Sequence, residues 1–202
     1  DPKIRDIARS LYRDVADLPI VSPHGHTDPE WFATNAPFGN AAELLLLPDH
    51  YLFRMLYSQG IRLEDLGVGG HPADPREAWR ILAENYHLFR GTPSRMWLDW
   101  VFAEAFGIDV RLDGETADLY FDTITEALQR DEFRPRALFD RYGIEVIATT
   151  ESPLDSLENH RTIRESSWQG RVITAYRPDP VIDPEFEGFA QNLATFSELT
   201  GE

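Results

Sequence analysis

The chain has 202 residues, 42% of them hydrophobic, which is enough for one large folded domain or two small ones. Its formal net charge of −16 argues against nucleic acid and anionic membrane surfaces as partners, because both are bound by basic surfaces. There is no cysteine, which excludes disulfides and thiolate metal ligands, and no apolar run approaches the roughly 20 residues of a membrane span. We therefore expect a cytoplasmic protein with no nucleic-acid or membrane partner.

The first segments predict a helix followed by a strand. Residues 1–17 carry apolar side chains at helical spacing. Residues 18–23, with the sequence LPIVSP, are a β-prone run that predicts a buried strand of about four residues.

The middle of the chain predicts helices. Asp49 is the expected N-cap of a helix that stops at Gly60, and Asp74 is the expected N-cap of a helix that stops at Gly91. Between them, residues 67–75 predict a loop. Further helices are predicted at residues 92–108, 114–133 and 134–143.

Strands and helices alternate in the last third of the chain. Residues 144–152 and 171–179 are β-branched runs, and each precedes a predicted helix, at 152–167 and 183–199. This order predicts an α/β fold with a parallel sheet, which the first strand joins. The helices of about residues 40–140 then form an insertion between the first two strands.

Each predicted strand ends in polar residues. The carboxyl ends of parallel strands meet at one edge of the sheet, where ligands bind. The residues concerned are His24 and His26 on the first strand, Thr149, Thr150 and Glu151 on the second, and Tyr176, Arg177 and Asp179 on the third. The sequence therefore predicts a site built from segments that are distant along the chain.

His24 and His26 can form a pair of metal ligands. In an extended chain, residues i and i+2 point to the same side, so both imidazoles can reach one ion. Gly25 between them leaves room for that approach. The alternative is an H-x-H that arises by chance among six histidines, and two ligands do not complete a site.

The DHYLFR segment holds a second group of candidates. His50 and Arg54 are at i and i+4 and share a helix face, with Tyr51 next to them, so they can hold an oxygen-rich ligand. His50 can also act as an acid or base near neutral pH. The alternative is a capped surface helix with Tyr51 in the core.

Arg177 is the third candidate. A guanidinium at the end of an inner strand is costly without a partner, and its planar fork fits a carboxylate or phosphate at two points. The alternative is a structural salt bridge, to Asp179 or another acid.

Other polar and aromatic residues have structural interpretations. His71 is expected in a solvated loop, and His87 and His160 are expected to pack or cap helices. The aromatic residues of the middle region are expected in its core, namely Trp79, Tyr86, Trp97, Trp100 and Phe106. The sequence has no glycine-rich phosphate motif and no nucleophile elbow.

Several motifs follow one another along residues 1–179. They are H-x-H after the first strand, DHY..R at a helix start, FRGTP before a tryptophan-containing helix ending in FGI, TTESPLDSLENH, and YRPD. In this order they resemble the uronate isomerases, a branch of the amidohydrolase superfamily.

The resemblance implies a (β/α)₈ TIM-type barrel. Residues 1–202 would be the N-terminal portion, with about three strands and the helical insertion. It also implies a divalent metal, commonly zinc, bound by His24 and His26, with a later histidine and an aspartate beyond residue 202 as further ligands. His50 and Tyr51 would be catalytic, near the reacting hydroxyls. Arg177 would bind the sugar-acid carboxylate, and Arg54 would also be a substrate-binding residue.

The resulting hypothesis is aldose–ketose isomerisation of a hexuronate, such as glucuronate to fructuronate, by metal-assisted proton transfer through an enediol. A sugar acid is then the small-molecule partner, and a homo-oligomer is expected. Two alternatives stay open, a metal-dependent hydrolase of the same superfamily and a non-catalytic sugar-acid binding domain.

Overall fold

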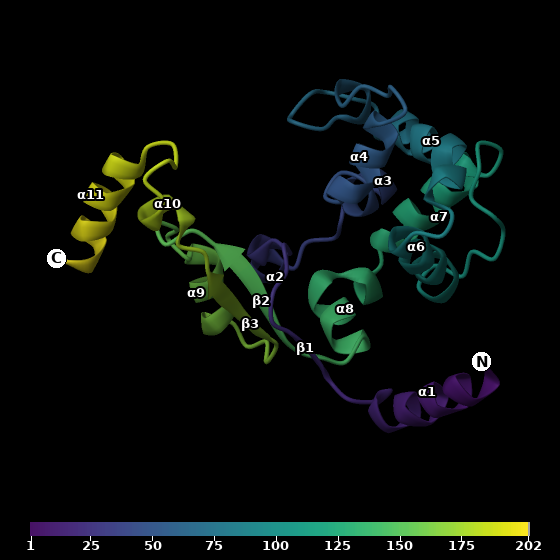
Figure 1. Cartoon of the computed structure of the whole chain (residues 1–202), viewed down its shortest axis with the longest axis horizontal. Coiled ribbons are helices and arrows are strands. Elements are labelled where there is room, and N and C mark those ends of the chain that lie inside the picture. Colours follow the sequence, from purple (N-terminus) through teal and green to yellow (C-terminus); the bar gives the residue numbers. More distant parts are fainter. Residues whose placement is uncertain (202) are drawn as a thin grey trace. The chain divides into compact units, whose positions relative to one another are not determined.

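Three parallel strands form the only sheet among residues 1–201, which are the residues that the computed structural model describes. The strands β1 (Ile20–Ser22), β2 (Ile144–Glu151) and β3 (Arg171–Tyr176) lie in the order β1-β2-β3 (Figure 1). Ile20 pairs with Ile144, and Val146 pairs with Arg171. The predicted parallel sheet is thus confirmed.

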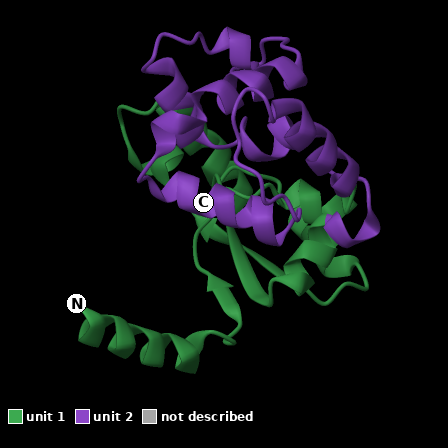
Figure 2. Cartoon of the chain, turned by 90° about the vertical axis from the view of Figure 1, so that its right-hand side faces the viewer, with its two compact units in different colours: residues 1–36, 135–202 green, residues 37–134 purple. Residues whose placement is uncertain are grey.

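The chain divides into two units, shown in different colours in Figure 2. Residues 1–36 and 135 onward form the unit that contains the sheet, and residues 37–134 form a helical unit. Each unit has its own core. No helix among residues 1–201 is long and apolar enough to cross a membrane.

The prediction of a buried first strand is wrong for this chain. Ile20 and Val21 are 48% and 58% exposed. The physical reason is the position of β1 at the edge of the sheet, where it pairs only with β2 in the described chain. β2 is the central strand, and its Val146 and Ala148 are buried.

Three helices of the sheet unit pack with one another and against β2 and β3. A small core joins Phe32 of α2 (Pro29–Thr34), Phe139 of α8 (Pro135–Arg141) and Ile163 of α9 (Glu158–Glu165). Trp168 stacks on Phe32 with ring centroids 5.6 Å apart. Because α9 connects β2 to β3, these segments form the predicted βαβ unit.

The remaining helices of this unit are α1 (Pro2–Val15), α10 (Asp179–Ile182) and α11 (Phe189–Thr200). The apolar stripe predicted for the first helix is present on α1, and its side chains are exposed in the described chain. β3 ends at Tyr176, short of the predicted residue 179, and two helices begin later than the sequence predicts. α9 begins at Glu158 because Leu157 is left-handed at φ 54°, and α11 begins after Gly188, whose φ is 76°.

The helical unit contains α3 (Ala41–Leu45), α4 (His50–Tyr57), α5 (Pro75–Asn85), α6 (Pro93–Glu104) and α7 (Ala117–Leu128). The predicted N-caps are confirmed, since Asp49 accepts from Tyr51 N at 2.8 Å and Asp74 accepts from Arg76 N at 2.9 Å. The largest fully buried side chains of this unit include Trp79, Tyr86, Phe89 and Phe102.

Two of the aromatic residues predicted for this core are not buried. Trp97 and Trp100 are 58% and 54% exposed. The buried face of α6 consists of Leu98 and Phe102, which are one helical turn apart, so the two tryptophans lie off that face. Phe106 is half-buried and stacks on Phe133.

Two buried tyrosines of this unit are unsuited to proton transfer near neutral pH. The Tyr86 hydroxyl donates to Asp99 Oδ1 at 2.9 Å, and burial beside this carboxylate raises the pKa of Tyr86 far above its usual value. Burial also raises the pKa of Tyr120 to about 12. Both phenols therefore stay protonated and have structural roles.

Candidate functional site

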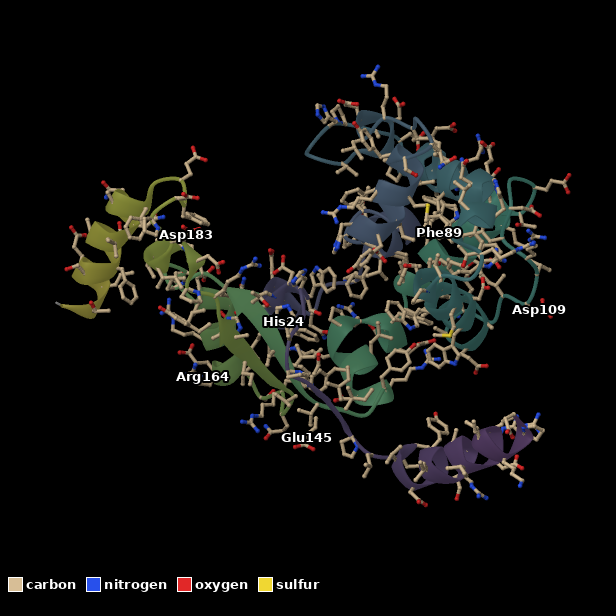
Figure 3. The ribbon with its side chains drawn as sticks, viewed as in Figure 1. His24, Phe89, Asp109, Glu145, Arg164 and Asp183 are labelled. Atoms are coloured by element: carbon tan, nitrogen blue, oxygen red, sulfur yellow. The ribbon has the colours of Figure 1, made fainter. Side chains whose placement is uncertain are left out.

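His24 and His26 lie side by side just after β1, and Figure 3 labels His24 beside the sheet. Their ring centroids are 5.2 Å apart and the ring planes are nearly perpendicular, at 82°. Both side chains are exposed. The shared orientation predicted from the i, i+2 spacing is therefore present.

This separation fits a shared metal ion. Zinc bonds histidine nitrogen at about 2.0–2.1 Å, so two imidazoles on one tetrahedral ion have ring centroids about 5 Å apart. Among residues 1–201, no group of three or more metal-ligating side chains lies together. The donors that are present thus fit a metal as part of a ligand set, and the pair alone does not fill one.

Thr150 connects the end of β2 to the histidine pair. Its Oγ1 lies 2.9 Å from the carbonyl oxygen of Gly25 and 3.3 Å from Nδ1 of His24. The ends of the first and second predicted strands are thus joined by direct contacts.

The space around Gly25 does not require a glycine at this position. A Cβ there would lie 3.6 Å from the Ala148 carbonyl oxygen and 3.9 Å from Thr27 Oγ1, which are ordinary contact distances. We therefore expect Gly25→Ala to change the thermal midpoint by only a few degrees. Thermal unfolding of the variant tests this, and Gly143→Ala is a contrast, since φ is +61° there. A collapse of folding in Gly25→Ala would contradict the expectation.

A cavity of about 590 Å³ lies beside the histidine pair. Four segments line it, and their polar side chains dominate. They are residues 26–29 after β1, residues 150–152 at the end of β2, residues 155–160 leading into α9, and Arg177 after β3. The cavity therefore brings together residues that follow all three strands, as the sequence predicts.

Arg177 lies on the lining of this cavity and pairs with a neighbouring acid. Its Nε is 3.5 Å from Asp179 Oδ2, and its main-chain N–H donates to the Glu151 carbonyl at 3.4 Å. The Arg177 and Asp179 side chains are 60% and 53% exposed. The salt bridge that the sequence offered as an alternative is therefore present. Because both side chains are largely exposed, the Arg177 charge is not buried.

A buried polar cluster forms part of the cavity lining, and the sequence did not predict that His160 belongs to it. His160, 6% exposed, lies with Nε2 2.9 Å from Thr149 Oγ1 and 3.8 Å from Glu151 Oε2. The Glu151 side chain is 8% exposed, and its Oε2 has no hydrogen-bond partner. The predicted packed role of His160 is confirmed, and the signal for the cluster was the polar run TTESPLDSLENH.

His50, Tyr51 and Arg54 all belong to α4 in the helical unit. The His50 and Tyr51 rings are 4.2 Å apart between centroids. Tyr51 is 63% exposed, so the alternative that places this side chain in the core is wrong. Arg54 is exposed and lies in the last turn of α4.

An apolar cavity of about 430 Å³ opens beside Tyr51 in the same unit. Trp97 and Phe89, the latter labelled in Figure 3, are among its lining residues. The exposed tryptophan therefore lines a hollow, and the predicted catalytic tyrosine has an apolar neighbourhood on one side.

Comparisons with known proteins give a consistent result. Residues 3–202 match the family model described as glucuronate isomerase. The uronate isomerase of Sphingopyxis alaskensis is 74% identical over 206 residues, and that of Rhizorhabdus wittichii is 69% identical over 202 residues. Both alignments cover the whole of this chain, but only 44% and 43% of the respective relatives. The chain thus spans less than half the length of these relatives.

Solved structures show the same likeness. The crystal structure of glucuronate isomerase from Caulobacter crescentus gives a TM-score of 0.95 at 60% identity, over 100% of this chain and 43% of that one. Uronate isomerase from Thermotoga maritima gives a TM-score of 0.86 at 28% identity, over 96% of this chain and 42% of that one. Since the family model covers nearly every residue, the chain belongs to the glucuronate isomerase family.

Proposed function

We propose that the protein carrying this chain interconverts a hexuronate, such as D-glucuronate, and its keto form, such as D-fructuronate. The observation that carries the proposal is one polar cavity lined by both His26 and Arg177, in a chain of the glucuronate isomerase family. A cation-binding group and a carboxylate-binding group on the same cavity suit a sugar acid. The family match favours isomerisation over hydrolysis and over a non-catalytic binding domain.

The residues of this chain have separate roles in this proposal. The Arg177 guanidinium binds the carboxylate of the sugar acid and so orients the carbon chain. His50 and Tyr51 move protons between the reacting oxygens while the C2 proton is transferred to C1 through an enediol. Arg54 adds a positive charge to the same helix as His50 and Tyr51, where it can bind an anionic substrate.

A divalent metal, zinc by preference, is part of the proposal. His24 and His26 would hold it together with ligands from outside this chain. When bound, such an ion stabilises negative charge that develops on substrate oxygens.

We further propose that the complete protein is a (β/α)₈ barrel. The support is the parallel β1-β2-β3 sheet with a βαβ connection, and the edge strand β1, whose apolar residues are exposed in this chain. The expected homo-oligomer and cytoplasmic location stay predictions.

The test of the function is an assay of the full-length protein on glucuronate, with the keto product measured directly. A panel of amides and esters is assayed in parallel. Keto product from a hexuronate supports the proposal. Turnover of an amide or ester alone would indicate a hydrolase, and sugar-acid binding without any turnover would indicate a binding domain.

A further inference from the structure

The hydroxyl of Thr150 contacts two groups that differ in whether they can donate a hydrogen bond. Oγ1 lies 2.9 Å from the Gly25 carbonyl oxygen and 3.3 Å from His24 Nδ1. A carbonyl oxygen can only accept a hydrogen bond, whereas an imidazole nitrogen can donate or accept. A threonine hydroxyl has one proton to donate and lone pairs to accept with.

These rules assign the protons. Because the Gly25 carbonyl cannot donate, the Thr150 hydroxyl donates its single proton to it. The Thr150 oxygen is then an acceptor for His24, so the proton of the neutral imidazole lies on Nδ1. The lone pair of His24 is therefore on Nε2, the nitrogen that faces away from Thr150.

We propose that Thr150 is a positioning residue that holds His24 as the Nδ1–H tautomer and so presents Nε2 as its metal-binding nitrogen. The proposal rests on the proposed function for the identity of the bound group. Metal-ligating histidines usually donate their second ring N–H to an oxygen, which fixes the tautomer and the ring orientation. Here the oxygen is a side chain from the neighbouring strand, so β1–β2 pairing also sets the orientation of His24.

The neighbouring residue, Thr149, makes a different set of contacts from Thr150. Thr149 Oγ1 donates to the Ile173 carbonyl at 3.2 Å and lies 2.9 Å from His160 Nε2. Thr149 is fully buried, whereas Thr150 is half-buried, as expected for adjacent residues on opposite faces of a strand. The hydroxyl of Thr149 therefore bonds within the buried core, and the hydroxyl of Thr150 contacts the exposed histidine pair.

The first experiment measures the tautomer of His24 in the metal-free full-length protein. Long-range ¹H–¹⁵N spectra of ¹⁵N-histidine protein distinguish the two nitrogens, and the signals missing from His24→Ala identify His24. We expect an Nδ1–H tautomer in the wild type and in Thr150→Ser, and a loss of that preference in Thr150→Val. An Nε2–H tautomer in the wild type would overturn the proposal, whether or not the protein is an isomerase.

The second experiment measures zinc affinity by competition with a chromophoric chelator. Thr150→Val keeps the β-branched shape and removes the hydroxyl, so we expect about 10–100-fold weaker zinc binding, the usual effect of losing such a partner. Thr150→Ser should restore most of the affinity. Thr162→Val, an exposed position on α9, is the matched control and should bind zinc as the wild type does.

The zinc affinity of His24→Ala, measured in the same way, distinguishes failure of the Thr150 proposal from failure of the metal assignment. If His24→Ala loses zinc but Thr150→Val does not, or if Thr150→Ser is as weak as Thr150→Val, the role of Thr150 is overturned and the proposed function stands. If His24→Ala binds zinc like the wild type, the metal assignment itself fails, and the role of Thr150 fails with it.

Discussion

His24→Ala in the full-length protein should lose its divalent metal and, with it, nearly all isomerase activity. In the proposed metal site, His24 is one of two donors from this chain, and a zinc site with a missing ligand binds poorly. We expect bound zinc to fall from about one ion per chain to a small fraction, and activity to fall about a hundredfold or more. Elemental analysis of the purified variant, beside an assay on glucuronate, measures both.

The stability of the metal-free variant gives the control. His24 is exposed, so its removal should change the free energy of unfolding of metal-free protein by about 0.5 kcal/mol or less. His71→Ala is the matched variant, since His71 is an exposed histidine in a loop of the helical unit, and it should keep both metal and activity. Full metal content in His24→Ala would rule out the metal pair.

Arg177→Met should raise KM for hexuronates by about ten- to a hundredfold. A hydrogen bond to a charged group contributes about 1.5–3 kcal/mol, and methionine keeps an unbranched apolar side chain while removing the charged guanidinium. The alternative, a purely structural pair with Asp179, predicts unchanged kinetics. Steady-state kinetics with varied glucuronate separates the two.

Stability measurements give a second way to distinguish carboxylate binding by Arg177 from a purely structural pair with Asp179. Because Arg177 and Asp179 are both more than half exposed, their ion pair should contribute less than about 1 kcal/mol to stability. A large fall in the free energy of unfolding with no change in KM would favour the structural interpretation. Arg164→Met is the control, an exposed arginine on α9 outside the lining of the polar cavity, and its KM should match the wild type.

Much of the fold was predictable because its signals are local. The β-branched runs of β2 and β3 and the Asp caps of α4 and α5 depend on neighbouring residues only. The late start of α9 was less visible. Asp155 Oδ1 accepts from Leu157 N at 2.7 Å, and this turn ends at a left-handed residue, so local hydrogen bonding outweighs the helical pattern before Glu158.

Three short helices were missed, namely α2, α3 and α10, and the first two carry a clear N-cap signal. α2 has Asp28 as N-cap followed by a proline, and α3 has Asn40 as N-cap. Both helices are too short for periodicity to be recognised. The buried face of α6 was predicted wrongly for a different reason. Large apolar residues lie all around this helix, so their spacing does not select Leu98 and Phe102 over the tryptophans.

The residues of the candidate site could be predicted from the sequence, but the contacts between them could not. The strand ends identify His24, Arg177 and the polar end of β2, because parallel strands share one edge. The contact of Thr150 with Gly25 and His24 depends on the register of β1 against β2, which includes an irregularity after Ile20. This register depends on how two strands from distant parts of the chain pack together, so neither strand shows it by itself.

The contact between Thr150 and His24 joins residues 126 apart in the sequence, and this separation has a kinetic consequence. Closing so long a loop is entropically costly, and contacts of high sequence separation slow folding. The helical unit between them has its own core within residues 37–134, so each of its contacts closes a shorter loop than the contact of Thr150 with His24. We therefore expect this unit to fold first and draw the ends of β1 and β2 together. Pulse-labelling hydrogen exchange should then protect amides of α5 and α7 before those of β1. The histidine pair would acquire its orientation in a late folding step, and simultaneous protection of all these amides would contradict that order.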